Sequence, residues 1–65
     1  MELAKQMKQL MEFVEVGLTQ GATHWHVCRL TAERFELWDD DRFPLWLSFS
    51  VAGQMREMGI ETDDG

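Results

Sequence analysis

Cys28 is the only cysteine in this 65-residue chain, so no intrachain disulfide can hold the fold together. A chain of this size buries only roughly 60% of the surface that its unfolded form exposes, and small domains usually add disulfides, a metal or a partner subunit. The length excludes a doubly wound nucleotide-binding sheet and a (β/α) barrel. We expect one compact domain over residues 1–60, followed by an acidic frayed tail over 61–65.

The charge balance narrows the classes of partner. Acidic side chains outnumber basic ones by 12 to 6, giving a formal net charge of −6. A general phosphate-backbone binder needs clustered Lys and Arg, so we expect no direct nucleic-acid partner, and anionic membranes are disfavoured as well. The opening residues are not typical of a signal peptide, no stretch approaches the ~18 apolar residues of a membrane span, and a lone cysteine favours a reducing compartment. These features predict a cytoplasmic protein.

Apolar residues at intervals of three and four predict helices at the two ends of the chain. An amphipathic helix is predicted over residues 2–18, ending before Gly21, with an inner stripe of Leu3, Met7, Leu10, Met11, Val14 and Leu18. Phe13 and Val16 fall on its polar side, which indicates either a second exposed apolar spot or a helix that ends near residue 12. A shorter helix is predicted over 51–58, with Ser50 as its N-cap and Gly59 after its end.

The middle of the chain has the alternation and composition of strands. Residues 23–30, 35–38 and 42–49 are predicted as three strands, with a polar turn at Asp39-Asp40-Asp41. A helix over 43–49 would place Phe, Leu and Trp all around its circumference, so a strand is favoured there. The predicted order is α-β-β-β-α, an α+β fold with both helices on one face of a three-stranded antiparallel sheet.

The open face of that sheet would carry tryptophan. Period-two alternation places Trp38 and Trp46 on it, whereas Trp25 joins them only if His24, His26 and Cys28 face inward. Exposed aromatic clusters mark binding surfaces, so we expect partner contacts at Trp25, Trp38 and Trp46, with Phe13 as a weaker addition. The alternative is that the tryptophan rings fill the small core.

The most specific chemical pattern is His24-x-His26-x-Cys28. On a strand these three side chains share a face, and their ligand set suits zinc or copper. Successive ligands on a flat strand are about 6.5–7 Å apart and no fourth ligand has a familiar spacing. We therefore expect no metal and no cofactor, and a metal-binding module is only a second alternative. A Cys28–His26 nucleophile pair would need an oxyanion site and a pocket, so we expect no enzyme.

Together these features predict a small non-enzymatic protein–protein interaction module that acts as a homodimer. A regulator or inhibitor of a larger bacterial or phage-targeted machine is the expected role. The alternative function is binding or sequestering of a nucleotide-like ligand at a subunit interface. Stacked tryptophans and Arg29 or Arg42 would hold such a ligand.

Overall fold

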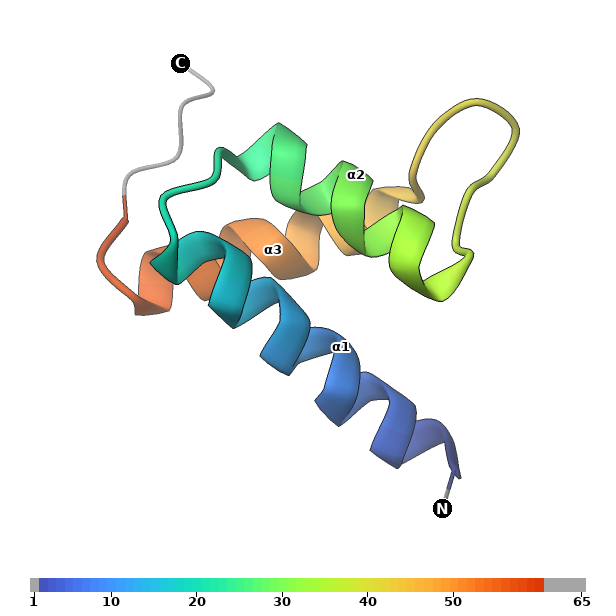
Figure 1. Cartoon of the computed structure of the whole chain (residues 1–65), viewed down its shortest axis with the longest axis horizontal. Helices are drawn as coiled ribbons and strands as arrows, with labels where there is room; N and C mark the ends of the chain where they lie inside the picture. Colours follow the sequence, from blue (N-terminus) through green and yellow to red (C-terminus); the bar gives the residue numbers. More distant parts are fainter. Residues whose placement is uncertain (1, 61–65) are drawn as a thin grey trace.

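The computed structural model describes residues 2–60, and the side chains of residues 4–60, as three helices joined by two loops (Figure 1). The helices are α1 (Glu2–Thr19), α2 (His24–Phe35) and α3 (Leu45–Glu57). Residues 2–60 contain no strand, and their sole β-type pairing is an isolated bridge between Asp39 and Arg42. The predicted α+β class and its three-stranded sheet are therefore wrong, and the fold is all-α.

Helix α1 agrees with the helix predicted over 2–18, and it buries Leu10, Val14 and Leu18. It ends as expected at Gly21, whose φ of 94° is open to glycine at little cost. The Ala22 N–H donates to the Gly17 carbonyl at 3.1 Å, which satisfies an otherwise unpaired carbonyl of the last turn. The helix does not stop near residue 12, so Phe13 and Val16 are helical.

Helix α2 replaces the strands predicted over 23–30 and 35–38. Thr23 caps it, because its hydroxyl oxygen accepts a hydrogen bond from the His26 N–H at 3.2 Å. The buried residues then recur with helical and not with strand spacing: Val27, Cys28, Thr31 and Ala32. The helix ends at Glu36, which adopts a left-handed conformation with φ 56°.

Helix α3 replaces the strand predicted over 42–49 and begins well before the predicted 51–58 helix. Pro44 precedes its first turn with φ −69° and ψ 153°, so Ser50 is an interior residue and not the N-cap. Leu47, Val51 and Met55 are buried at intervals of four. The predicted end is confirmed: Gly59 has φ 77°, and the Ile60 N–H donates to the Met55 carbonyl at 2.8 Å.

The loop over 36–44 contains a tight turn at its tip, and this confirms the polar turn expected there. The Asp39 N–H donates to the Arg42 carbonyl at 2.7 Å, and the Arg42 N–H donates to the Asp39 carbonyl at 3.2 Å. Asp40 has a φ of 60°, which aspartate tolerates better than most residues. In Figure 1 this loop projects from the end of the bundle between α2 and α3.

The core lies where α2 packs against both other helices. Its buried apolar members come from all three: Leu10, Val14, Leu18, Val27, Cys28, Ala32, Leu47, Val51 and Met55. Within residues 2–60, no helix combines the length and apolar character that crossing a membrane requires.

Candidate functional site

All three tryptophans lie at the surface. Trp25 is 56% exposed, Trp38 39% and Trp46 43%. The alternative in which these rings fill the core therefore does not describe this structure. Their exposure cannot come from the open face of a sheet, because residues 2–60 form no sheet; it comes from the outer sides of α2 and α3 and from the loop between them.

Two of the tryptophans line one groove with a volume of about 630 Å³. Its walls are the N-terminal half of α2, the loop before α3 and the first turn of α3. The residues lining it are Trp25, Arg29, Trp38, Asp39, Asp41, Arg42, Phe43, Pro44, Leu45 and Ser48. Trp38 packs on Phe43 with a ring-centroid distance of 6.4 Å. We call this feature the aromatic groove.

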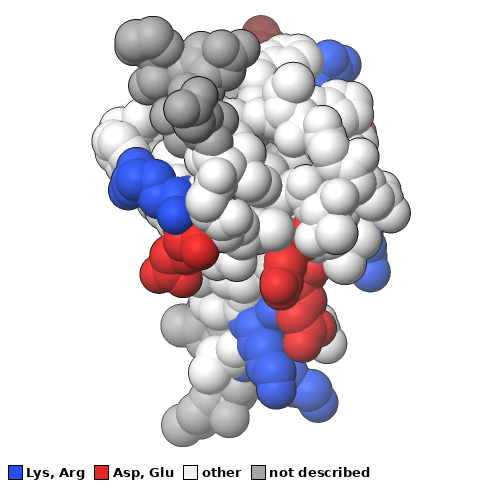
Figure 2. Space-filling model, turned by 90° about the vertical axis from the view of Figure 1, so that its left-hand side faces the viewer, with Lys and Arg blue, Asp and Glu red and all other residues white. Residues whose placement is uncertain are grey.

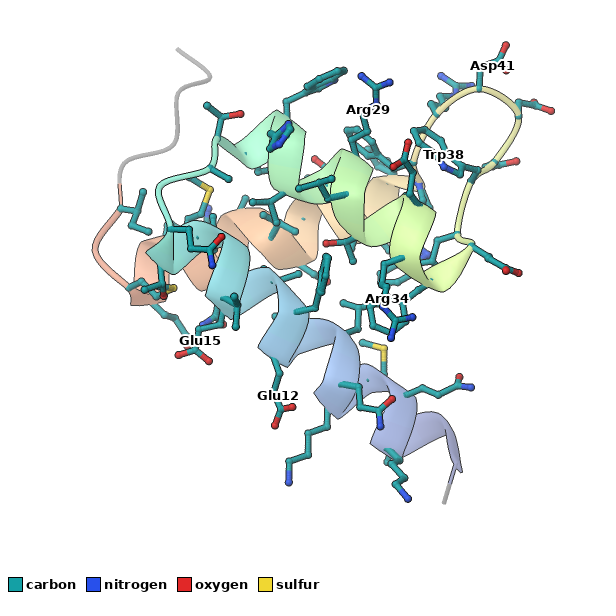
Figure 3. The ribbon with its side chains drawn as sticks, in the orientation of Figure 1. Glu12, Glu15, Arg29, Arg34, Trp38 and Asp41 are labelled. Atoms are coloured by element: carbon teal, nitrogen blue, oxygen red, sulfur yellow. The ribbon has the colours of Figure 1, made fainter. Side chains whose placement is uncertain are left out.

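The aromatic groove is also lined by the two arginines that were predicted as ligand contacts, Arg29 and Arg42. The Arg29 guanidinium lies 5.3 Å from the centroid of the Trp25 ring, and its Nε is 4.0 Å from a carboxylate oxygen of Glu33. Asp39 and Asp41 line the same groove, so its formal charges balance. Figure 3 shows Arg29 on α2 facing the loop that carries Trp38 and Asp41.

A second apolar surface runs along α3. Leu45 is 71% exposed and Phe49 is 66% exposed, and the two lie one turn apart on the same side of the helix. Trp46 borders them, while Ala52 and Gly53 continue that side as half-buried small residues. We call this set, Leu45, Trp46, Phe49, Ala52 and Gly53, the α3 outer face. Leu45 belongs to both surfaces.

The remaining predicted partner-binding residue, Phe13, lies elsewhere. It is half-buried on α1 and meets Phe35 of α2 edge to face, with ring centroids 5.9 Å apart. This contact closes the α1–α2 interface. Phe13 and Trp46 are both absent from the walls of the aromatic groove, so the structure divides the predicted partner-binding set among three places.

The His24-x-His26-x-Cys28 pattern is split by the helix. His24 and Cys28 lie on one side, with Nε2 and Sγ 3.7 Å apart, whereas His26 is exposed and lies outside this contact. His24 Nε2 also lies 3.0 Å from the Ser48 carbonyl oxygen, to which it donates. Burial raises the pKa of the Cys28 thiol to about 11, which keeps it protonated. In the described part of the chain, no three His, Cys, Asp or Glu side chains are grouped to hold a metal ion.

Charged side chains also lie on parts of the surface away from these apolar features. Figure 2, which views the left-hand side of Figure 1, shows blue and red side chains close together across the middle and lower part of this face, with a largely uncharged area above them on the right. In Figure 3, Glu12 and Glu15 point outward from α1, away from the aromatic groove. Glu12 and Glu15 therefore add no charge to the aromatic groove, whose own carboxylates are those of Asp39 and Asp41.

No known family model, curated protein or solved structure matches this chain. Function is therefore inferred from the geometry of the two apolar surfaces. The large apolar residues Phe43, Leu45 and Phe49 of these surfaces were not predicted as site residues, because the strand pattern assigned them to an inner face. Helical spacing of Leu45 and Phe49 at i and i+4 is the signal that would have identified them as one side.

Proposed function

We propose that this chain is a small non-enzymatic interaction module that binds a segment of another protein in the aromatic groove. The observation that carries the proposal is the convergence of Trp25, Trp38 and Leu45, all more than a third exposed, on one groove. Large exposed apolar surfaces on small proteins mark interaction sites, and tryptophan dominates interface energetics. An apolar side chain of the partner enters between the two indoles, and the partner backbone follows the groove.

The charges around the groove favour a polypeptide over a free anion. Arg29 already lies over Trp25 and beside Glu33, while Asp39 and Asp41 stand in the same walls as Arg42. A phosphate group would approach two arginines and two aspartates together, so it gains little net attraction. A peptide carries both donors and acceptors and satisfies a rim of mixed charge.

Site-specific photo-crosslinking in the cells that make this protein tests the proposal. A photoreactive phenylalanine analogue at position 38 is expected to give one discrete adduct, and the same analogue at position 9, exposed on α1, none. Trp25→Ala should remove the adduct at position 38, whereas the neighbouring exposed variant His26→Ala should retain it. Absence of an adduct at position 38, or an equal adduct at position 9, would overturn the proposal.

A second candidate function is binding of a nucleotide-like ligand. It is favoured by one observation: Arg29 and Arg42 share the groove with Trp25 and Trp38, which supplies stacking surfaces and cations together. Titration with ADP and GMP, followed by tryptophan fluorescence, tests it. Saturable quenching that Arg42→Ala weakens and Lys8→Ala preserves would favour this candidate. An unchanged spectrum at millimolar nucleotide would exclude these two nucleotides.

In the protein-binding proposal the chain acts by occupying its partner's surface, as a regulator or inhibitor does. Such a role requires no reacting group, and the groove needs only apolar contact area and hydrogen-bonding groups at its rim. The metal-binding alternative is not retained, since His24 is engaged with Ser48 and His26 lies outside that contact.

A further inference from the structure

We propose that the α3 outer face pairs with the same face of a second copy in an antiparallel, two-fold arrangement centred on Phe49. This inference concerns a surface that shares only Leu45 with the groove described above, and it does not depend on a partner binding there. Helix α3 packs against the rest of the fold on one side only. Leu47, Val51 and Met55 are buried, yet the opposite side of the helix leaves Leu45 71% exposed and Phe49 66% exposed.

Gly53 gives the first indication of what covers this side. Glycine in the middle of a helix costs roughly 1 kcal/mol relative to alanine. Nothing in the described fold requires glycine here: its φ is not positive, and an added Cβ would meet only the Arg56 Nη2 atom, at 4.0 Å. A backbone left bare on a partly exposed helix face permits close approach of another chain.

The order of large and small residues along the face is self-complementary. With a two-fold axis at Phe49, position 45 lies level with position 53 of the second copy, and position 46 with position 52. On the helix surface, Leu45 and Ala52 lie on one side of Phe49, and Trp46 and Gly53 lie on the other. The two-fold axis places each of these sides against the same side of the second copy, as an isologous interface requires.

The resulting contacts match large side chains with small ones. Leu45 packs on Ala52 of the second copy, and the Trp46 indole covers the bare backbone at Gly53 of the second copy. The two Phe49 rings meet at the axis. The antiparallel arrangement brings the end of α3 that carries exposed Arg56 toward the start of α3 in the second copy, which follows the loop with exposed Asp39, Asp40 and Asp41, so these groups have opposite charge.

A second copy is the occupant that this pattern selects, because the small residues and the large side chains that pack on them lie on the same helix. Self-association also supplies what a short chain without a disulfide lacks, namely additional buried apolar area.

Sedimentation equilibrium of the full chain tests the pairing. We expect a reversible monomer–dimer equilibrium. Phe49→Lys, which places two cations at the axis, should raise the dissociation constant by about 30-fold or more. Gly53→Leu, which places a large side chain over the bare backbone at this position, should also raise the dissociation constant while retaining the helical circular dichroism signal. Val16→Lys, an exposed apolar position on α1, is the matched control and should leave the equilibrium unchanged.

Disulfide capture reports the symmetry itself. F49C should form a covalent dimer on mild oxidation, because a residue on a two-fold axis meets its own copy, whereas V16C should stay monomeric. Cys28 is buried and does not compete. A monomer at millimolar concentration, or a dimer insensitive to both Phe49→Lys and Gly53→Leu, would overturn the pairing. Loss of the dimer with retained crosslinking at position 38 would leave the groove proposal intact.

Discussion

His24 Nε2 lies 3.0 Å from the Ser48 carbonyl oxygen, joining the first turn of α2 to the start of α3. Within residues 4–60, the side-chain hydrogen bonds that connect two helices all join His24 to Ser48, whose hydroxyl oxygen also lies 3.5 Å from Nε2. Ser48 also lines the aromatic groove, so this bond fixes one wall of the groove against α2. The histidine pattern that suggested a metal site thus contributes a structural link between helices.

Replacing His24 with leucine should lower the free energy of unfolding by about 1 kcal/mol, because the substitution keeps apolar volume but removes the hydrogen bond. For a domain of this length, that corresponds to a fall in melting temperature of roughly 4–8 °C. His26→Leu is the control, since His26 is exposed and outside this contact. Equal melting temperatures for the two variants would show that the His24 bond contributes nothing.

The ends of the fold were predictable from local chemistry. Helix α1 and the terminations at Gly21 and Gly59 follow from helical apolar spacing and from the left-handed conformation that glycine adopts readily. Neither feature depends on what the rest of the chain does, because the relevant contacts are formed within a few residues of one another. Local signals of this kind can be identified from the sequence alone.

The middle of the fold was not predictable in the same way, and α3 shows why. A helix over 43–49 was rejected because it would carry large apolar residues on all sides, and that is what the structure contains. Leu47 is buried, whereas Leu45, Trp46 and Phe49 are exposed. Apolar patterning indicates a core only where the other face is polar, so an exposed apolar face opposite the core hides the helical pattern.

The candidate site was predicted in composition but not in arrangement. The sequence predicted partner contacts at Trp25 and Trp38 and ligand contacts at Arg29 and Arg42. The structure brings these four residues to one groove. They converge because α2 presents Trp25 and Arg29 at i and i+4, and the tight turn at Asp39–Arg42 folds the loop back over them. The turn itself is local, but the position of the loop relative to α2 depends on how α2 and α3 pack, which the sequence alone does not specify.

Glu36 offers a test of backbone strain. It has a φ of 56° at the end of α2, a conformation that costs a non-glycine residue roughly 1–2 kcal/mol. Glu36→Gly should therefore raise the free energy of unfolding by about 1 kcal/mol, measured by urea denaturation. Glu33→Gly places the same residue inside α2 and should lower it by about 1 kcal/mol. Destabilisation by both variants would mean that the left-handed position is not strained.

Thr31 tests the cost of an unpaired polar group. Its side chain is fully buried on α2, and its hydroxyl has no hydrogen-bond partner in the described structure. Valine has nearly the same shape without the hydroxyl, so Thr31→Val should stabilise the fold by about 1 kcal/mol. Thr19→Val, at an exposed position, should change stability by less than about 0.5 kcal/mol. A lower melting temperature for Thr31→Val would show that the hydroxyl is bonded in solution.

The buried Cys28 thiol should make the free energy of unfolding depend on pH in the alkaline range. Burial raises its pKa from 9.0 to about 11, so above pH 9 the unfolded chain releases a proton that the folded chain retains. The free energy of unfolding should therefore fall between pH 9 and 11, and a thiol reagent at pH 8 should react only after denaturant unfolds the protein. Cys28→Ala should remove this part of the pH dependence at some cost in overall stability. Rapid modification of the native protein at pH 8 would show instead that the thiol is accessible.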